Sequence, residues 1–174
     1  MPNLDSASGL IPVGHESGAC FVLAEHTIDP SYTTKIFRGD PVRLNAGNIE
    51  KGTNAGTDTA GVFKGVSYIN AKGKYEFSPY WTGEADATEI KALIYNDPGV
   101  IYEIQATNST LANLGSAFDL TLVDGESTIG QSKTVLDTTG TTGASYKIIG
   151  LSKRPGNDWG DNVKVLVKII NHSM

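Results

Sequence analysis

Hydrophobic and polar side chains alternate along most of the chain, a pattern that predicts β-strands. The alternation is clearest at 163–170, where the apolar side chains share one face and Lys164 and Lys168 share the other. The segment 89–95 contains helix-favouring Glu, Lys and Ala, but its apolar residues still recur at every second position. We therefore predict a strand there as well.

The predicted strands are short, and turn-forming residues separate them. Asn45-Ala46-Gly47 supplies a glycine where a tight turn needs a positive φ, so the strand before it and the strand through Ile49 form a hairpin. A second turn at 70–74 leads strand 61–69 back into 75–81. Further strands are expected at 100–106, 117–123, 133–137, 146–151 and 163–170. Short strands with such loops are typical of a small barrel or sandwich.

Composition supports an all-β fold. Of the 174 residues, 39% are hydrophobic, only 19% are charged and 20 are Gly, while Thr, Ser and Asn are frequent. Such a chain favours turns and strands over long helices. Asp97-Pro98-Gly99 interrupts both helix and sheet, so it is the expected boundary between a β subdomain at 30–96 and a small barrel or sandwich subdomain at 97–174. No short period recurs, so a solenoid is not indicated.

The first 29 residues differ from the rest. Gly, Ser and Pro interrupt them repeatedly before one apolar stretch at 19–24. We interpret residues 1–29 as an extended N-terminal arm that feeds a first strand. Such an arm has little core of its own, so we expect it to lie on a neighbouring chain.

Charge removes several classes of function. Lys and Arg number 14 against 19 Asp and Glu, which gives a formal net charge of -5. An acidic chain offers no basic stripe for phosphates, so nucleic acid is not an expected partner. The single cysteine, Cys20, allows no intrachain disulfide. The start of the chain has neither a basic nor an apolar stretch typical of a signal peptide, and no apolar run reaches the roughly 18 residues of a membrane helix.

Two groups of residues could be considered as metal ligands. His15, Cys20 and His26 are the clustered soft ligands, but their spacing fits no zinc pattern. The loop 156–162 gathers oxygen-bearing side chains that calcium could use. It lacks the ligand spacing and closing Glu of a helix-loop-helix site, and a hydrogen-bonded turn needs the same residue types. We predict no metal site.

No pattern points to catalysis. The chain has no Gly-x-Ser-x-Gly elbow, and Asp119 and Asp124 are interpreted as solvated carboxylates on surface strands and loops. Arg38-Gly39-Asp40 resembles an adhesion tripeptide but is interpreted as a strand-to-turn element. Glycosylation patterns at Asn108 and Asn171 have no role without a secretory signal. We therefore predict no catalytic, cofactor-binding or metal residues and no enzyme activity.

Aromatic residues gather around Tyr80 and Trp81, with Tyr75 earlier on the same predicted strand and Tyr68 on the preceding one. Rings exposed on a sheet can stack on sugars. Rings on paired strands more often pack across the sheet or anchor a protein interface. Packing is the favoured interpretation, and glycan binding stays as the alternative.

Several short segments, in their order along the chain, resemble a family of structural proteins encoded beside the major capsid gene of tailed bacteriophages. Many of these proteins decorate or stabilise the head. The matching segments are FRGDPVRL at 37–44, GVFKGV at 61–66 with FSPYW at 77–81, NDP at 96–98, EIQA at 103–106, ANLGSAFDL at 112–120, GQSK at 130–133 and LSKRPGN at 151–157. The arm at 1–29 lies outside the resemblance.

The resemblance implies a non-enzymatic virion protein that is made in a bacterial cytoplasm and binds the outside of a capsid as a decoration or cement protein. Its implied partners are the major capsid protein and neighbouring copies of itself, as a trimer or another closed oligomer. An acidic chain is compatible with an outer surface that meets no packaged DNA. Two alternatives remain open: a glycan- or receptor-binding β module of a fibre, and a head-to-tail joining protein.

Overall fold

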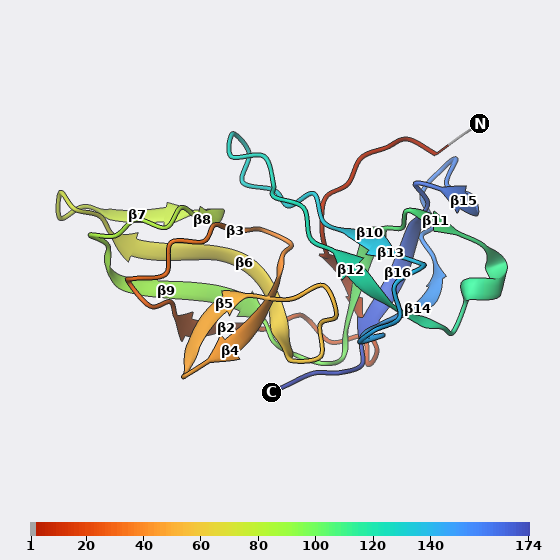
Figure 1. Ribbon diagram of the computed structural model, residues 1–174, viewed down its shortest axis with the longest axis horizontal. Coiled ribbons are helices and arrows are strands. Elements are labelled where there is room, and N and C mark those ends of the chain that lie inside the picture. Colours follow the sequence, from red (N-terminus) through yellow and green to blue (C-terminus); the bar gives the residue numbers. More distant parts are fainter. Residues whose placement is uncertain (1–2) are drawn as a thin grey trace.

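The computed structural model describes residues 3–174 and consists almost entirely of β-strands arranged in two bodies (Figure 1). This confirms the predicted all-β fold. The first body contains β2 (Leu23–Thr27), β3 (Ile36–Phe37), β4 (Pro41–Asn45), β5 (Asn48–Lys51), β6 (Thr59–Ile69), β7 (Tyr75–Ser78), β8 (Tyr80–Trp81) and β9 (Thr88–Tyr95). The second contains β1 (Ile11–His15), β10 (Val100–Gln105), β11 (Asn108–Ser109), the 3-10 helix η1 (Leu111–Asn113), β12 (Ala117–Thr121), β13 (Val135–Asp137), β14 (Tyr146–Leu151), β15 (Gly160–Asp161) and β16 (Lys164–Ile169). Among the described residues, no helix is long and apolar enough to cross a membrane.

The first body is a five-stranded barrel. Its strands follow the order β4-β5-β2-β9-β6, and pairing of β6 with β4 closes the ring, while β7 extends the sheet from β6. The hairpin predicted around Asn45-Ala46-Gly47 joins β4 to β5, with Ala46 and Gly47 both at positive φ. The strand predicted at 89–95 is also confirmed as β9.

The second body closes in the same way. Its strands follow the order β10-β16-β14-β12-β13, and a parallel bridge between Ala106 and Leu136 brings the end of β10 to β13. The backbone N–H of Thr107 donates to the carbonyl of Leu136 at 3.0 Å across this contact. The first barrel likewise contains one parallel pair, Thr27 with Asn48, between its first and third strands.

The N-terminal segment is built into its own chain. The expectation that residues 1–29 form an arm lying on a neighbour is wrong for its two strands, because β1 pairs with β10 and β2 pairs with β9. Before β1, the backbone N–H of Ser6 donates to Gln105 and its carbonyl accepts from Lys164. Leu10 is buried, which supplies the apolar anchor that composition alone did not reveal.

The two barrels repeat one topology. If the strands are numbered within each barrel, β2, β4, β5, β6 and β9 correspond to β10, β12, β13, β14 and β16. In both barrels the order around the ring is first, fifth, fourth, second, third, and the third strand meets the first in parallel. The chain therefore contains a structural repeat much longer than a solenoid period.

Backbone hydrogen bonds repeat with the strands. The N–H of Gly39 donates to the carbonyl of Phe63 at 2.9 Å, and that of Gly115 donates to Ile148 at 2.9 Å. In return, the N–H of Phe63 donates to the carbonyl of Asp40, which follows Gly39. In the same way, the N–H of Ile148 donates to the carbonyl of Ser116, which follows Gly115. Gly39 and Gly115 both have positive φ, which glycine adopts without steric cost.

The last two strands of each barrel repeat most closely. A β-bulge interrupts the pairing between Phe63 and Gly65 in β6 and between Ile148 and Gly150 in β14. The register then aligns IKALI at 90–94 with VKVLV at 163–167. The residues just before these runs, Glu89 and Asn162, are two of the four positive-φ residues other than glycine in the described chain.

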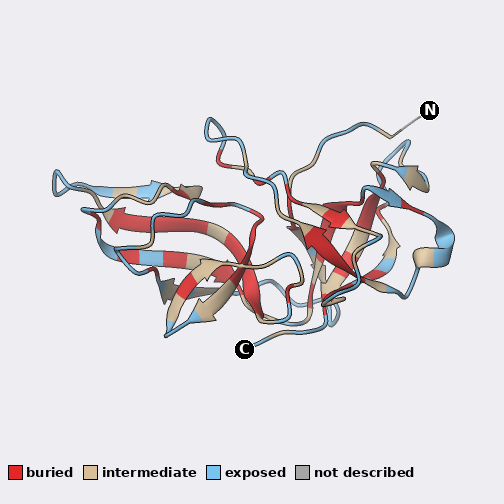
Figure 2. Ribbon diagram, viewed as in Figure 1, coloured by how far each residue is buried: buried red, intermediate tan, exposed pale blue. Residues whose placement is uncertain are grey.

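The two cores meet where the chain crosses between barrels. β9 ends at Tyr95 and β10 begins at Val100, so the change of body falls at the predicted boundary around Asp97-Pro98-Gly99. Val62 and Tyr95 come from the first barrel but pack in the core of the second. Figure 2 shows both buried interiors and the mostly exposed loops at the far ends of the molecule. Division into two subdomains stays a prediction.

Candidate interaction surfaces and the buried polar networks behind them

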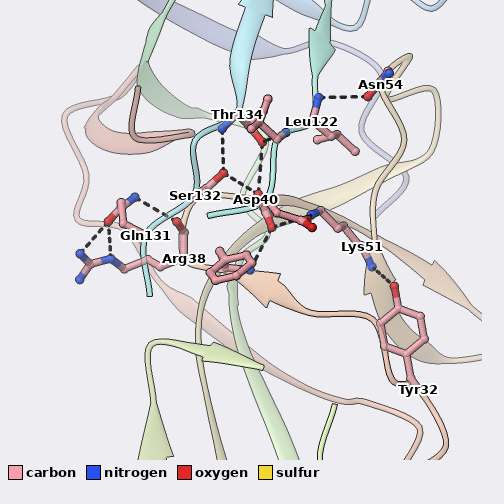
Figure 3. Close-up of polar contacts among 12 residues, drawn as sticks. Tyr32, Arg38, Asp40, Lys51, Asn54, Leu122, Gln131, Ser132 and Thr134 are labelled. Atoms are coloured by element: carbon pink, nitrogen blue, oxygen red, sulfur yellow. Dashed lines mark hydrogen bonds and ion pairs between the residues drawn. The ribbon is translucent and has the colours of Figure 1, made fainter. Parts of the chain in front are cut away.

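A buried carboxylate ties the two barrels together. Asp40 is fully buried at the start of β4 and accepts hydrogen bonds from the backbone N–H of Phe37 at 2.9 Å and from the hydroxyls of Ser132 at 2.5 Å and Thr134 at 3.3 Å (Figure 3). Ser132 and Thr134 belong to the long loop between β12 and β13. The carboxylate therefore fixes this loop of the second barrel to the first.

Lys51 completes this network from β5. Its ammonium lies 3.5 Å from Asp40 and 2.8 Å from Asp124, an exposed residue of the same long loop. Burial raises the pKa of Asp40 above its ordinary value, and the bonds from Ser132 and Lys51 only partly offset that effect. Tyr32 adds a further contact, because its hydroxyl accepts from the backbone N–H of Lys51 at 2.9 Å (Figure 3).

Glu103 on β10 forms a second buried network. Its carboxylate accepts a hydrogen bond from the hydroxyl of Ser152 and two from the guanidinium of Arg154, at 2.9 and 2.5 Å. Burial raises the pKa of Glu103, but the hydrogen bonds from Arg154 and Ser152 together outweigh burial and hold the pKa below its usual range. This network fixes the loop after β14 against β10.

Four of the segments that suggested a resemblance to phage proteins meet in two pairs at these networks. FRGDPVRL at 37–44 contacts GQSK at 130–133, where Arg38 donates to Gln131 at 2.8 and 2.6 Å. EIQA at 103–106 contacts LSKRPGN at 151–157 through Glu103 and Arg154. Their residues therefore hold loops in place. They form no open cluster of reactive groups.

The aromatic group divides into buried and exposed rings. Trp81 is 0% exposed, donates from Nε1 to the carbonyl of Tyr32 at 2.8 Å and meets Tyr68 edge to face. Tyr80 stacks on Phe37 with ring centroids 5.3 Å apart. The glycan hypothesis requires Tyr80 and Trp81 to be exposed, so Trp81 supplies no stacking platform. Tyr75 is 67% exposed on β7.

The residues considered as soft metal ligands lie apart. His15 is held by Asp97, with Nε2 3.1 Å from Oδ2, and its Nδ1 accepts from Ser17. Cys20 is exposed before β2, and His26 lies on β2. Between residues 3 and 174, no group of three or more His, Cys, Asp or Glu side chains is placed to hold a metal ion.

The acidic loop at 156–162 uses its side chains to build itself. Asn157 donates to the carbonyls of Ser152 and Lys164 and accepts from the N–H of Lys164, which pins the loop to β16. The side chain of Asp158 accepts from the N–H of Trp159 at 2.8 Å. These bonds fit the predicted hydrogen-bonded turn.

The two carboxylates weighed for catalysis have separate partners. Asp119 accepts from the backbone N–H groups of Thr142, Gly143 and Ala144 at 2.7–2.9 Å, whereas Asp124 pairs with Lys51. Asp119 is buried, so its interpretation as a solvated surface carboxylate is wrong. Arg38-Gly39-Asp40 precedes β4 as predicted, with Asp40 pointing inward.

Two strand edges expose large apolar side chains, and sequence reasoning did not identify either edge as a surface. On β7, Tyr75 and Phe77 are 67% and 57% exposed and share one face of the strand. Beside β2, Phe21, Val22 and Leu23 are 39%, 66% and 39% exposed. Between the barrels lies a groove of about 290 Å³, lined by Leu10, Ile11, Pro12, Phe21, Arg38, Phe63, Lys64, Tyr95 and Gln131.

Alternation at 75–78 places Tyr75 and Phe77 on one face of β7 but does not show whether that face is exposed. For the surface beside β2, the apolar run at 19–24 was the available signal. Comparison of this chain with protein-family models, with curated proteins and with solved structures finds no match.

Proposed function

We propose that this protein is a non-enzymatic virion component that binds the outside of a phage capsid and stabilises the shell. The observation that carries the proposal is the pair of exposed aromatic rings on β7, Tyr75 and Phe77, at the free edge of a closed barrel. Tyr and Phe are enriched in the buried centres of protein interfaces. The resemblance of the ordered segments between 37 and 157 to phage head proteins supports the same function.

The physical role follows from burial across a boundary. A protein that contacts two neighbouring capsomers adds surface that must be exposed again before they separate, so it stabilises only the assembled shell. The two barrels suit this role because buried polar networks at Asp40 and Glu103 hold their loops. The net charge of -5 fits a surface that meets no DNA.

The test measures binding of purified protein to expanded shells of a major capsid protein, the partner that the resemblance implies. We expect Tyr75→Ser combined with Phe77→Ser to weaken binding by about tenfold or more, because central aromatic anchors dominate interface energies. The matched control is Leu111→Ser combined with Leu114→Ser, which removes two exposed apolar side chains around η1 in the other barrel. Equal binding by the wild type and the β7 variant would contradict the assignment of this surface.

The number of copies on a particle distinguishes the alternatives. Many copies spread over the shell support decoration, whereas a single ring indicates a head-to-tail joining protein. Glycan binding has one specific observation in its favour, the exposed ring of Tyr75. The receptor-binding alternative replaces decoration under two conditions. Immobilised glycans must bind the wild type but not the Tyr75→Ser variant, and capsid shells must bind neither the wild type nor that variant.

A further inference from the structure

One edge of strand β2 has no partner along most of its length. Along one edge, β2 pairs with β9 from Leu23 to Thr27. Along the other edge, called the outer edge here, it meets β5 at a single residue pair, Thr27 with Asn48. In residues 3–174, no other strand pairs with this outer edge.

The repeat shows what such an edge accepts. β10 is the equivalent of β2, and its outer edge is covered by β1, which runs antiparallel to it. β2 pairs with β9, and β10 pairs with β16, the strand equivalent to β9. Matching the two registers makes Ala24 correspond to Tyr102 and Glu25 to Glu103. β1 covers β10 at these same positions, with Pro12 opposite Tyr102 and Ile11 opposite Glu103. The chain thus covers this edge in one barrel and leaves it open in the other.

The open edge carries the apolar surface of an interface. Phe21, Val22 and Leu23 form the one run of three consecutive exposed large hydrophobic residues in the described chain. By contrast, Val100 and Ile101, which take the positions of Val22 and Leu23 in the covered strand, are buried and half-buried. A free strand edge with apolar side chains readily pairs with another strand, so natural proteins usually cover it.

We propose that β2 pairs with β2 of a second copy of this chain, antiparallel and about a twofold axis near Leu23 and Ala24. The covering strand in the second barrel is antiparallel, and an antiparallel edge can pair with its own copy about a twofold axis. The chain's own β1 is already engaged by β10, so β2 itself supplies the partner strand.

Charge is compatible with this pairing. With the axis at Leu23 or at Ala24, Glu25 lies opposite Phe21 or Leu23 of the second copy, both uncharged. Glu25 is already paired with Lys91 on β9, with Nζ 3.8 Å from Oε2. The pairing thus joins apolar residues without placing like charges opposite each other. It goes beyond capsid binding, because it concerns the purified protein alone.

Sedimentation equilibrium of the purified full chain tests the pairing without any shells. We expect the wild type to form a dimer and Val22→Asp to raise the dimer dissociation constant by about tenfold or more, because a carboxylate would be desolvated among the apolar side chains where the two strands pair. Val13→Asp is the matched control, since Val13 is an exposed valine on β1 in the other barrel. A monomeric wild type, a trimer, or an equal effect of the two variants would overturn the proposal.

Cross-linking places the axis. With Cys20→Ser as background, Leu23→Cys or Ala24→Cys, whichever residue lies on the axis, should give a disulfide-linked dimer under mild oxidation, because residues opposite each other across an antiparallel pair bring their Cβ atoms to about 5 Å. Val13→Cys in the same background should stay uncross-linked. If neither Leu23→Cys nor Ala24→Cys gives more dimer than Val13→Cys, the twofold pairing at β2 is wrong. A protein that dimerises but does not bind shells would contradict the proposed function alone. A protein that binds shells but does not dimerise would contradict this inference alone.

Discussion

Asp40 and Glu103 are both buried, and each accepts hydrogen bonds from a loop that is distant in sequence. A buried carboxylate is tolerated only where hydrogen bonds and opposite charge replace water. Both sites meet that condition, which explains how these two polar residues hold loops of the barrels in place. The sequence showed these residues but not their partners, because Ser132 and Arg154 approach across separations that local patterns do not record.

Removing the Asp40 carboxylate should be strongly destabilising. Asp40→Ala leaves the hydroxyls of Ser132 and Thr134 and the Phe37 N–H without an acceptor, so we expect the free energy of unfolding to fall by about 3–5 kcal/mol. Urea unfolding at pH 7 measures the change. Asp40→Asn keeps an acceptor and should lose less.

Asp124→Ala is the matched control for Asp40. It removes the other carboxylate that contacts Lys51, but Asp124 is 81% exposed, so the expected loss is about 0–1 kcal/mol. Similar losses in the two alanine variants would contradict the role of Asp40 as the anchor of the long loop.

Glu103 predicts a dependence on pH. Its folded-state pKa lies below the ordinary value of 4.5, so its stabilisation is present above that value and is lost as the pH falls through the lower folded-state pKa. We expect Glu103→Gln to reduce the free energy of unfolding by about 1–3 kcal/mol at pH 7, with the difference shrinking below pH 4.5.

Denaturant unfolding of the Glu103 variant at a series of pH values measures this difference. Glu16→Gln is the control, because Glu16 forms an ion pair of 2.5 Å with Lys168 but lies at the surface. A loss for Glu103→Gln that stays constant down to pH 3 would show that the carboxylate charge is not the source of the effect.

At the scale of elements, the repeated bulge differs in what covers it. A Cβ atom at Gly65 would lie 2.8 Å from the ring of Phe77 and 3.0 Å from the carbonyl of Ser78, both on β7. At Gly150 the nearest atom would be the Leu166 methyl group at 3.8 Å. Within residues 3–174, the second barrel has no strand equivalent to β7 at this place, so its bulge is open.

The same substitution to alanine should therefore affect the free energy of unfolding very differently at the two glycines. Gly65→Ala should lower the free energy of unfolding by about 1–3 kcal/mol, because the added methyl group overpacks β6 against β7. Gly150→Ala should change it by less than about 0.5 kcal/mol, or stabilise slightly through the unfolded chain. Thermal and urea unfolding of both variants measure this, and equal losses would show that β7 does not press on the bulge.

Strand positions follow from the sequence, but edge partners do not. The pattern of apolar residues located β6, β9, β10 and β16, and in β9 and β16 the buried apolar residues recur at every second position. It gave no partner for the segment 11–15, where Pro and Gly weaken the pattern and a bulge between Pro12 and Gly14 restores the pairing. The interpretation of residues 1–29 as an arm reflects that local irregularity.

At the scale of the whole molecule, two barrels of one topology share a junction. Val62 and Tyr95 pack into the second core, and Asp40 holds a loop of the second barrel. The repeat escaped sequence reasoning because loops of unequal length separate its matching runs. IKALI at 90–94 and VKVLV at 163–167 share only Lys and Leu, although their backbones take the same register. The burial of Trp81 and the exposure of Tyr75 likewise depended on which strands cover them.

The repeat also poses a sorting problem while the chain folds. β9 and β16 present nearly interchangeable apolar faces, so either could in principle dock on the first strand of the wrong barrel and trap a swapped intermediate. The first strands differ where it matters: β2 carries Ala24 and His26 at the positions where β10 carries Tyr102 and Ile104. Tyr102 and Ile104 fill far more volume than Ala24 and His26, so we expect this difference between the repeats to favour the native pairing of each strand over the swapped one.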